Sequence, residues 1–495
     1  MGKTILIIDQ GGQSTRAIIF DVRGGIVASE SVPCPKPLQG PAHFVEYTAT
    51  SIVTSAQLML ERLVQRLTIE QIKNIDAVGI ITQRSSIIAC NKSTGQAITP
   101  MISWQDTRHS EWLSKQTFDL EQLQQWTGLR LSAHAGVSKM RWLLDYDNDV
   151  KLCAQQHNLL FVPWGAYFLQ QLSKNTTFIT DPILAARTGL TERGAHIWSK
   201  KLLSLFSIPA TLLPAIVPST YHYGELVLRG VAIPITLLGG DQNFIPCAYG
   251  STHYQYSAFL NIGTGAFIQA ASRSIATGIP PKNHLLNTAI AIEKNKELMP
   301  IIEGTINAAA TVLDWWQAQL PRAYTHAELD CHLHHVNAAP VFVNTLVGTG
   351  SPYWIPQRTP IFIEDDEQKE SSYEQKTVAV IESILFACRV NLEIMDPLVG
   401  QPNSRIKQLV ISGGLAQSVA LCQKLANLVQ IPVLRYDDNE ASARGAALYL
   451  QKSSDYYVEG CTDESPVLFS PKVIDLQLFQ RFQKYCLAMT SLSAK

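Results

Sequence analysis

The fold is decided by one stretch near the start of the chain, Thr4-Ile5-Leu6-Ile7-Ile8-Asp9-Gln10-Gly11-Gly12-Gln13-Ser14-Thr15-Arg16. Its apolar run Thr4–Ile8 predicts a strand, the glycines predict a tight turn, and Ser14–Phe20 predicts a second strand. Ile26–Ala28 can supply a third strand after the next turn. We therefore expect an antiparallel meander whose first turn carries glycine, which permits the close approach of a ligand to the backbone.

A helix and a further strand are expected after this meander. Apolar residues recur at helical spacing, and Ile75–Ile81 then forms a nearly continuous apolar run that predicts a buried strand. The order of meander, helix and strand is typical of an α/β domain. The residues with helical spacing are Ile52, Ala56, Leu60, Leu63 and Leu67.

The second half of the chain repeats this plan. Tyr256–Leu260, a turn containing Gly263 and Gly265, and Ala266–Ala270 again predict strand, glycine turn and strand. Ile411-Ser412-Gly413-Gly414 also resembles Leu238-Gly239-Gly240-Asp241 of the first half. Two similar domains are therefore expected.

Other segments of the second half have simpler predictions. A long amphipathic helix is expected before the strand Leu409–Ile411. The polar stretch Glu364–Lys376 predicts an exposed loop, and Ser453–Pro471 predicts a loose connection to a C-terminal helix. The long helix is marked by Ile381, Leu385, Cys388, Leu392 and Met395.

Composition narrows the classes of partner. The chain has 495 residues, too many for one hydrophobic core, and 40 Lys plus Arg balance 41 Asp plus Glu. This balance argues against binding to nucleic acid or anionic lipid and favours small molecules. No apolar run approaches the ~20 residues of a membrane span, so a cytoplasmic protein is expected. Nine Cys without a Cys-x-x-Cys pair favour reduced thiols.

Glycine turns at three places could bind phosphate through free backbone N–H groups. They are Gly11-Gly12, Gly263-Thr264-Gly265 and Gly413-Gly414, and the last leads from a strand into a predicted helix. Ordinary hairpin turns are the alternative for the first two. Gly2-Lys3-Thr4 is no P-loop, because no glycine precedes it at the required spacing.

Two carboxylates follow predicted strands, Asp9 and Asp241. An unpaired charge in such a place is unfavourable unless a metal or a substrate balances it. Phosphoryl transfer from ATP needs both a metal and a carboxylate that takes the proton of the attacking hydroxyl. The alternative is that each Asp only forms a turn.

The ordered motifs resemble the FGGY carbohydrate kinases, and the resemblance extends from about Lys3 to Leu450. It implies two actin-like (ribonuclease H-like) α/β domains with a nucleotide cleft between them. Residues 1–249 would be the N-terminal domain, with the sugar site, the Mg²⁺ site and a phosphate turn, and 250–495 the ATP-binding domain. The motifs are Asp9–Arg16, Val45-Glu46, Gln83-Arg84, Trp104–Arg108, Lys139-x-x-Trp142, Thr180-Asp181, Ala186–Thr188, Gly240–Gln242, Gly263–Gly265, Glu303-Gly304, Gly413-Gly414 and Glu440-x-x-x-x-Gly445-Ala446-Ala447.

The same resemblance implies roles for single residues. Asp241 would be the general base, and Asp9 would hold Mg²⁺ through water. The phosphates of ATP would contact the first turn (Gly11, Gly12, Gln13 and Ser14) together with Arg16, Gly263 and Thr264. Ala310, Gly413, Gly414, Gln417 and Ser418 would line the nucleotide pocket.

The expected substrate is a small polyol or sugar. Arg84, Trp104, Asp241 and Gln242 match polyol-contacting positions of glycerol kinases, which the motifs resemble most. Ser85 stands where those enzymes carry a glutamate, and His134 where they carry a tyrosine. Because a lost hydrogen-bond partner can cost a factor of ~10⁴ in discrimination, a larger polyol or a ketose becomes plausible.

Several departures concern the nucleotide side. Gly12 and Gln13 replace hydroxyl residues of the first turn, and Ala310 replaces a glycine. These changes are interpreted as tolerated variation, with weakened use of ATP as the alternative. A non-catalytic or regulatory nucleotide-binding protein of the same fold is the alternative function, which the changes at Ser85 and His134 leave open. The resemblance also implies a possible homo-oligomer, since family members are often dimers or tetramers.

Overall fold

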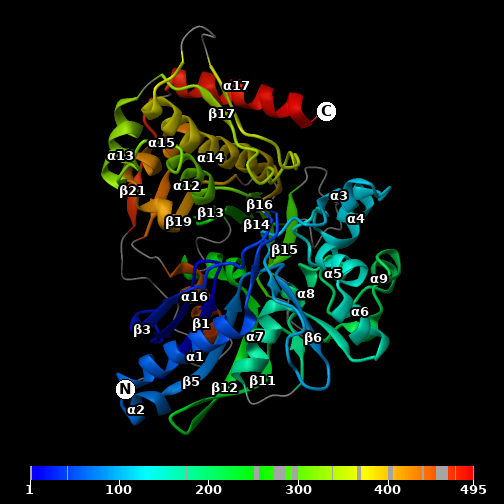
Figure 1. The fold of residues 1–495 in the computed structure, drawn as a ribbon. Coiled ribbons are helices and arrows are strands. Elements are labelled where there is room, and N and C mark those ends of the chain that lie inside the picture. Colours follow the sequence, from blue (N-terminus) through cyan, green and yellow to red (C-terminus); the bar gives the residue numbers. More distant parts are fainter. Residues whose placement is uncertain are drawn as a thin grey trace. The chain divides into compact units, whose positions relative to one another are not determined.

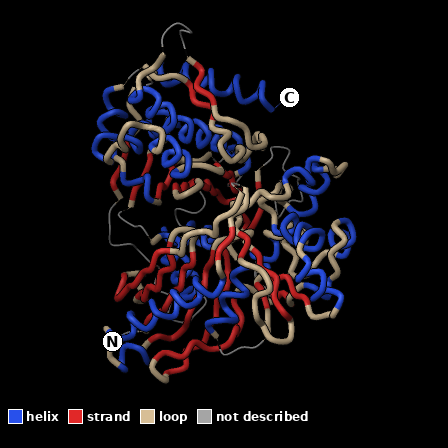
Figure 2. Tube along the Cα trace, viewed as in Figure 1, coloured by secondary structure: helices blue, strands red, loops and turns tan. Residues whose placement is uncertain are grey.

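The structure is a computed structural model that describes residues 3–41, 43–173, 177–249, 256–272, 285–291, 299–336, 338–364, 370–399, 405–436, 440–452, 466–473 and 475–493. The chain divides into two compact units, each of which contains both strands and helices (Figure 2). Unit 1 comprises residues 1–250, 288–300 and 440–462, and unit 2 comprises residues 251–287, 301–439 and 463–495. The expected functions of 1–249 and 250–495 stay predictions.

Unit 1 is built on a six-stranded sheet that consists, in spatial order, of β11 (Thr220–Leu228), β12 (Val231–Gly240), β5 (Ile75–Thr82), β1 (Thr4–Gln10), β2 (Ser14–Phe20) and β3 (Ile26–Pro33) (Figure 1). β1, β2 and β3 form the predicted antiparallel meander. β5 and β12 follow as parallel strands, and β11 is an antiparallel edge. β1 and β5 are buried along most of their length, which explains their continuous apolar sequences.

Helices pack on this sheet from distant parts of the chain. α1 (Ala49–Gln65) contacts β2 and β3, and α7 (Trp164–Leu172) contacts β5 and β12. Helix α1 ends just before Leu67, the last residue of its predicted apolar spacing. α16 (Ala441–Lys452) contacts β1 and the 3-10 helix η2 (Asp241–Tyr249), so the late segment of unit 1 lies beside its first strand.

A smaller four-stranded sheet completes unit 1. It consists, in spatial order, of β4 (Glu46–Tyr47), β7 (Met101–Ile102), β6 (Ile87–Asn91) and β8 (Leu159–Pro163). Its own apolar core includes Ile87, Ile102, Val137 and Phe161. The remaining helices and strands of unit 1 are α2 (Ile69–Lys73), α3 (Ser110–Ser114), α4 (Leu120–Thr127), α5 (Gly136–Tyr146), α6 (Asn148–Gln155), β9 (Ile179–Thr180), α8 (Pro182–Ala186), α9 (Lys200–Leu205), η1 (Ala210–Leu212) and β10 (Ala215–Ile216).

Unit 2 contains most of a seven-stranded sheet, whose spatial order is β15 (Leu286–Ala289), β16 (Pro300–Ile306), β14 (Ala266–Ala271), β13 (Ser257–Ile262), β19 (Gln408–Ser412), β20 (Val433–Arg435) and β21 (Val467–Phe469). β13, β14 and β16 are antiparallel neighbours, β19 and β20 are parallel to β13, and β21 is antiparallel to β20. Six of these strands correspond in order and direction to the sheet of unit 1, and β15 is an additional strand, so the predicted repeat of the plan is confirmed in outline. The corresponding series are β16, β14, β13, β19, β20, β21 and β3, β2, β1, β5, β12, β11.

The core of unit 2 lies around the long helix α14 (Tyr373–Met395), whose buried residues include the predicted Ile381, Leu385 and Cys388. The other elements of this unit are α12 (Ala310–Gln317), α13 (His326–His335), β17 (Val341–Val343), β18 (Ile361–Ile363), η3 (Asp396–Leu398), η4 (Gly414–Gln417), α15 (Val419–Val429) and α17 (Leu476–Ser493).

Two loop predictions are wrong in part. The expected loop Glu364–Lys376 includes the first turn of α14, which Ser372 and Gln375 begin with a capping box. The expected connection Ser453–Pro471 includes β21, which pairs with β20, while its residues 453–465 lie outside the described residues. The C-terminal helix is confirmed as α17. Among the described residues, we find no helix with the length and apolar character needed to cross a membrane.

Candidate active site

Asp9 lies at the end of β1 and is only 1% exposed. Its Oδ2 atom accepts hydrogen bonds from Arg16 Nη2 at 2.8 Å and from Ser442 Oγ at 3.0 Å. Arg16 faces it because the register of β1 and β2 pairs these two residues. Its other oxygen, Oδ1, is buried without a hydrogen-bond partner among the described residues. A buried carboxylate oxygen in this state is open to a further cation or donor.

Arg16 forms a second ion pair, from Nη1 to Glu440 Oε2 at 2.8 Å. Burial alone would lower the pKa of its guanidinium group, but the carboxylates of Asp9, Glu440 and Asp241 outweigh burial and raise this pKa. The side chain is therefore a permanent positive charge between carboxylates. Such a group can also bind phosphate oxygens.

The first glycine turn follows Asp9 directly. Gly11 N donates to Ser14 O at 3.0 Å, and Gln10 Nε2 donates to Gly11 O at 2.7 Å. Gly12 and Gln13 are exposed at its tip, and a Cβ atom at Gly12 would meet nothing within 4 Å. The base of the turn is thus fixed by hydrogen bonds, while its tip lies open.

Asp241 follows the last residue of β12 and is half-buried. Gln242 holds its carboxylate with two donors, N to Oδ1 at 2.7 Å and Nε2 to Oδ2 at 3.4 Å. Burial raises the pKa of Asp241 to about 6, with Arg84 lowering it and Asp9 raising it. A carboxylate with such a pKa is ionised at neutral pH but exchanges its proton readily, as a general base must.

Arg84 approaches Asp241 from the loop between β5 and β6 and is only 6% exposed. Its Nη1 atom donates to Asn243 Oδ1 at 3.0 Å, and Asn243 Nδ2 donates to Ala289 O at 2.6 Å. A Cβ atom at Gly240 would lie 2.6 Å from Arg84 Cδ, so glycine is needed for the Arg84 side chain to pass. Gly240 and Asn243 together fix this guanidinium group.

Ser85, the next residue, has a φ of 64° and is half-buried. This left-handed conformation is uncommon for a residue other than glycine, and its strain is typical of functional loops. Ser86 Oγ then accepts from Trp104 N at 2.9 Å and donates to Gln83 Oε1 at 3.1 Å. The loop that carries Arg84 is thereby bonded to the loop that carries Trp104.

Trp104 and His134 lie side by side, with ring centroids 6.2 Å apart. His134 Nδ1 lies 2.8 Å from Trp104 O, and because a carbonyl oxygen can only accept, this nitrogen carries the proton. Burial lowers the pKa of His134 to about 4, so the ring is neutral near pH 7. Its Nε2 atom is then an acceptor, a role that a tyrosine hydroxyl could also fill.

The glycine turn of unit 2 joins β13 to β14. Gly263 N donates to Gly265 O at 3.0 Å, while Gly263 O and Thr264 O accept from Ala310 N at 3.0 Å and Ala309 N at 2.9 Å. Gly263, Thr264 and Ala310 are all half-buried. The start of α12 thus holds this turn in place through backbone hydrogen bonds, and Ala310 donates one of them.

Gly413 follows β19 with a φ of 94°, and a Cβ atom there would lie 2.5 Å from Ile262 O. Conformation and packing both require glycine at this position. Gly414 and Gln417 are exposed, whereas Ser418 Oγ caps α15 through Leu421 N at 3.0 Å and also donates to Asp330 Oδ1. The hydroxyl of Ser418 therefore stabilises the start of α15 and links it to Asp330.

The structure brings most of the expected site residues into three groups. Two belong to unit 1: Asp9, Arg16, Arg84, Asp241 and Gln242 with the first turn, and the pair Trp104 and His134, which Ser86 bonds to the loop that carries Ser85. The third group belongs to unit 2 and consists of the two glycine turns with Ala310, Gln417 and Ser418.

Two further residues were not predicted from the sequence. Ser442 donates to Asp9 although 433 positions separate them, and Asn243 links Arg84 to Ala289. Neither belongs to a recognisable pattern of spacing. The place of Asn243 directly after Gly240-Asp241-Gln242 is the single feature that could have marked it.

Residues 4–245 match the FGGY family of carbohydrate kinases, N-terminal domain, and residues 258–451 match the C-terminal domain of the same family. The chain is 30% identical over 474 residues to a glycerol kinase of Polaromonas naphthalenivorans, which covers 93% of this chain and 92% of the relative. The chain belongs to the FGGY family of carbohydrate kinases. As an FGGY kinase it acts on a carbohydrate or a polyol, and kinases of this family use ATP.

Other FGGY kinases agree with this assignment. A glycerol kinase of Acinetobacter baylyi is 28% identical over 452 residues, 90% of this chain and 88% of the relative. The structure of Plasmodium falciparum glycerol kinase with ADP has a TM-score of 0.79 at 19% identity and covers 99% of both chains. A xylulose kinase of Lactobacillus acidophilus also has a TM-score of 0.79 at 19% identity, over 100% of this chain and 99% of that one. The two-domain FGGY kinase fold is therefore shown.

Proposed function

We propose that this kinase transfers the terminal phosphoryl group of ATP to a hydroxyl of a small polyol or ketose, with Asp241 as the general base. The observation that carries the proposal is the half-buried Asp241 carboxylate, which Gln242 holds in place and whose pKa is about 6. A base with this pKa is ready at neutral pH and accepts the proton of a hydroxyl as phosphoryl transfer develops.

Arg84, Trp104, His134 and Gln242 would bind the acceptor. The guanidinium group of Arg84, which Asn243 holds, would donate to oxygens of the substrate. The neutral His134 ring, whose Nδ1 is bonded to Trp104 O, would accept from a hydroxyl at Nε2. The indole of Trp104 offers an apolar face to carbon atoms. These contacts would orient one hydroxyl toward Asp241, and such orientation supplies much of the rate.

Asp9 fits the Mg²⁺ that kinases of this family usually need. Mg²⁺ prefers oxygen ligands and keeps several waters, so that one or two carboxylates and the substrate phosphates complete its shell. Asp9 Oδ1 supplies a buried oxygen without a partner, and among the described residues no cluster of three His, Cys, Asp or Glu side chains offers a closed metal site. When bound, Mg²⁺ would neutralise charge on the phosphates.

The glycine turns and Arg16 would hold the nucleotide. Gly11, Gly12, Gln13, Ser14 and Arg16 in unit 1, and Gly263 and Thr264 in unit 2, would face phosphate oxygens. Ala310, Gly413, Gly414, Gln417 and Ser418 would line the rest of the nucleotide site. Gly11 N and Gly263 N already donate within their turns, so other N–H groups of these turns and the Arg16 guanidinium would bind the phosphate oxygens. Preorganised donors of this kind stabilise the charge that develops in phosphoryl transfer.

Ser85 directs the choice of acceptor. It stands where glycerol kinases carry a glutamate. One strong hydrogen-bond acceptor is therefore missing from the site, and the smaller serine side chain leaves more room for the substrate. A four- or five-carbon polyol or ketose can use that space, and its additional hydroxyl can donate to the Ser85 hydroxyl. We therefore propose an acceptor larger than glycerol.

A screen of ATP consumption tests this function. Glycerol, erythritol, threitol, ribulose and xylulose would be offered with Mg²⁺, and phosphorylated product would be detected by ³¹P NMR. We expect turnover of a four- or five-carbon compound at a higher kcat/KM than glycerol. ATP binding without turnover of any acceptor would favour the regulatory alternative instead.

A further inference from the structure

Behind Trp104 and His134 lies a buried lysine that no step of phosphoryl transfer requires. Lys139, in the first turn of α5, is fully buried at 0% exposure. Its Nζ atom donates to the backbone carbonyl of His134 at 2.7 Å and to that of Ala133 at 3.3 Å. Ser138 Oγ also donates to Ala133 O, at 2.9 Å. The backbone that carries His134 is therefore held from α5 by two side chains.

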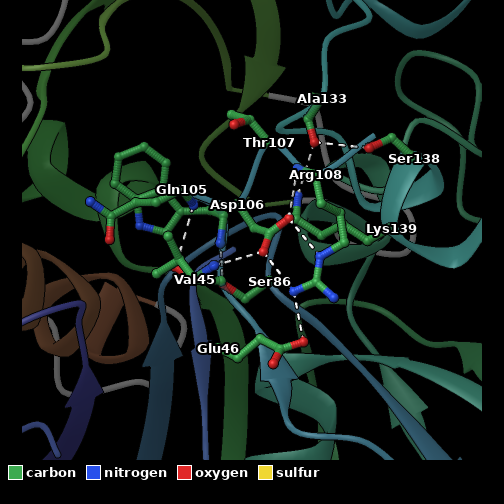
Figure 3. A network of polar contacts seen from close by, with 12 residues as sticks. Val45, Glu46, Ser86, Gln105, Asp106, Thr107, Arg108, Ala133, Ser138 and Lys139 are labelled. Atoms are coloured by element: carbon green, nitrogen blue, oxygen red, sulfur yellow. Dashed lines mark hydrogen bonds and ion pairs between the residues drawn. The ribbon is translucent and has the colours of Figure 1, made fainter. Parts of the chain in front are cut away.

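A cluster of charged side chains lies near Lys139. Arg108 forms a two-pronged ion pair with Asp106, from Nε to Oδ1 at 2.9 Å and from Nη2 to Oδ2 at 2.7 Å, and a further pair with Glu46 at 2.7 Å (Figure 3). Asp106 Oδ2 also accepts from Val45 N at 2.7 Å. Arg108 is thus paired with both carboxylates, and the Asp106 carboxylate also acts on the ammonium group of Lys139.

The same cluster holds the loop of Trp104. Asp106 lies two residues after Trp104, and its bonds to Val45 N and Arg108 fix this part of the backbone. The guanidinium group of Arg108 lies over the rings of Phe44 and Trp142, at 4.1 and 4.6 Å from their centroids, and these two rings contact each other edge to face. Rigid neighbours of this kind define the positions of the loops they support.

A buried lysine at this position is energetically unfavourable. Burial lowers the pKa of Lys139 to about 7, the Asp106 carboxylate raises it and Arg108 lowers it. An apolar side chain of similar length would avoid the free-energy cost of burying an ammonium group, because replacing buried charges by apolar groups is often neutral or stabilising. The bonds of Lys139 to Ala133 O and His134 O are what an apolar residue could not provide.

We propose that Lys139 is a positioning residue for the acceptor site, which holds the backbone of His134 so that the imidazole keeps its bond to Trp104 O and presents Nε2 to an acceptor hydroxyl. This rests on the proposed function, in which His134 contacts the acceptor. Lys139 itself touches neither acceptor nor nucleotide. Its effect passes through His134, and a loss of Lys139 therefore resembles a loss of the His134 contact.

Steady-state kinetics of Lys139→Met, His134→Phe and the double variant test this coupling. We expect Lys139→Met to raise KM for the acceptor about tenfold or more while KM for ATP changes less than twofold. The double variant is expected to match His134→Phe alone, since residues that act through one contact are not additive. Equal changes in both KM values, no change, or additive effects would overturn the proposal.

A control variant separates positioning from general stability. Lys424→Met removes another largely buried lysine, which donates to Glu382 Oε1 at 2.8 Å in unit 2. Like Lys139→Met it removes a buried ammonium group, but one that is paired with a carboxylate and lies far along the chain from His134. We expect it to lower thermal stability and to leave KM for the acceptor unchanged; an equal rise in this KM would overturn the proposal.

The state of His134 can also be measured without turnover. In protein labelled with [¹⁵N]histidine, long-range ¹H–¹⁵N spectra distinguish the two tautomers of the ring. We expect His134 to be Nδ1-protonated in the wild type and a mixture in Lys139→Met, whereas an unchanged tautomer would contradict the proposal. If no acceptor is phosphorylated, the proposed function fails, but this spectrum still decides the role of Lys139.

Discussion

Replacing Asp241 by Asn removes a carboxyl group whose ionised form the fold disfavours. The pKa of Asp241 is about 6, compared with an ordinary value of 3.8. As pH falls, Asp241 therefore binds a proton in the folded protein at a higher pH than it does in the unfolded chain. Above pH 6, where the carboxyl group is ionised in both states, the folded protein is less stable than it would be with a neutral side chain at this position. This destabilisation of the folded state decreases as pH falls and vanishes below about pH 4.

The size of this effect follows from the shift. About two pKa units at 1.36 kcal/mol each give up to about 3 kcal/mol above pH 6 and about half of that at pH 5. For a domain of this size, 1 kcal/mol changes Tm by about 2 °C. We expect Asp241→Asn to raise the apparent Tm by up to about 6 °C at pH 8, because an Asn side chain can still accept from Gln242 N.

Thermal unfolding followed by circular dichroism at pH 8 and pH 5 measures this gain. The exposed Asp149, in the first turn of α6, provides the control: Asp149→Asn should change Tm by less than about 1 °C at either pH. The reasoning is refuted if Asp241→Asn is no more stable than the wild type at pH 8, or if its gain does not shrink at pH 5.

Three further predictions concern the acceptor site. The logarithm of kcat/KM should fall with unit slope below about pH 6 and level off above it, and Arg84→Met should move this midpoint upward, because Arg84 lowers the pKa of Asp241; pH–rate profiles measure both. Gly240→Ala should raise KM for the acceptor at least tenfold with KM for ATP nearly unchanged, since its Cβ atom would displace Arg84; steady-state kinetics measure this. Ser85→Glu should improve kcat/KM for glycerol relative to larger acceptors at least tenfold, as competition assays would show.

Each of these predictions has a contrary outcome. A flat profile between pH 5 and 8, or a midpoint that Arg84→Met lowers, would contradict the assignment of the base. A Gly240→Ala enzyme with a normal KM for the acceptor would show that Arg84 does not bind it. An unchanged preference in Ser85→Glu would mean that this position does not select the acceptor.

Local signals made much of the fold predictable. The strands on both sides of Gly11-Gly12 and Gly263–Gly265 lie within a few residues of their turns, so short-range sequence determines them. The start of α14 was missed because the polar sequence suggested a loop, although the Ser372–Gln375 capping box was present. β21 was missed because it depends on pairing with β20, about thirty residues earlier, and its three residues carry little signal alone.

The site residues also fall into two classes, those that a local sequence pattern predicts and those that depend on distant partners. Asp9, Asp241 and the glycine turns could be predicted because each follows a strand or interrupts one, which is a local pattern. Ser442 and Asn243 could not, since their partners Asp9 and Ala289 become neighbours only after folding. The roles of Lys139 and of the His134 tautomer likewise depend on backbone carbonyls, which are the same for every sequence.

The central claim is that Asp241 is the base of an ATP-dependent kinase. The most direct measurement is kcat of Asp241→Asn with the best acceptor, together with calorimetric titration of ATP in the presence of Mg²⁺. We predict that kcat falls by a factor of ~10² to 10⁴ while the affinity for ATP stays within about threefold of the wild type. A variant that keeps its kcat would contradict the account.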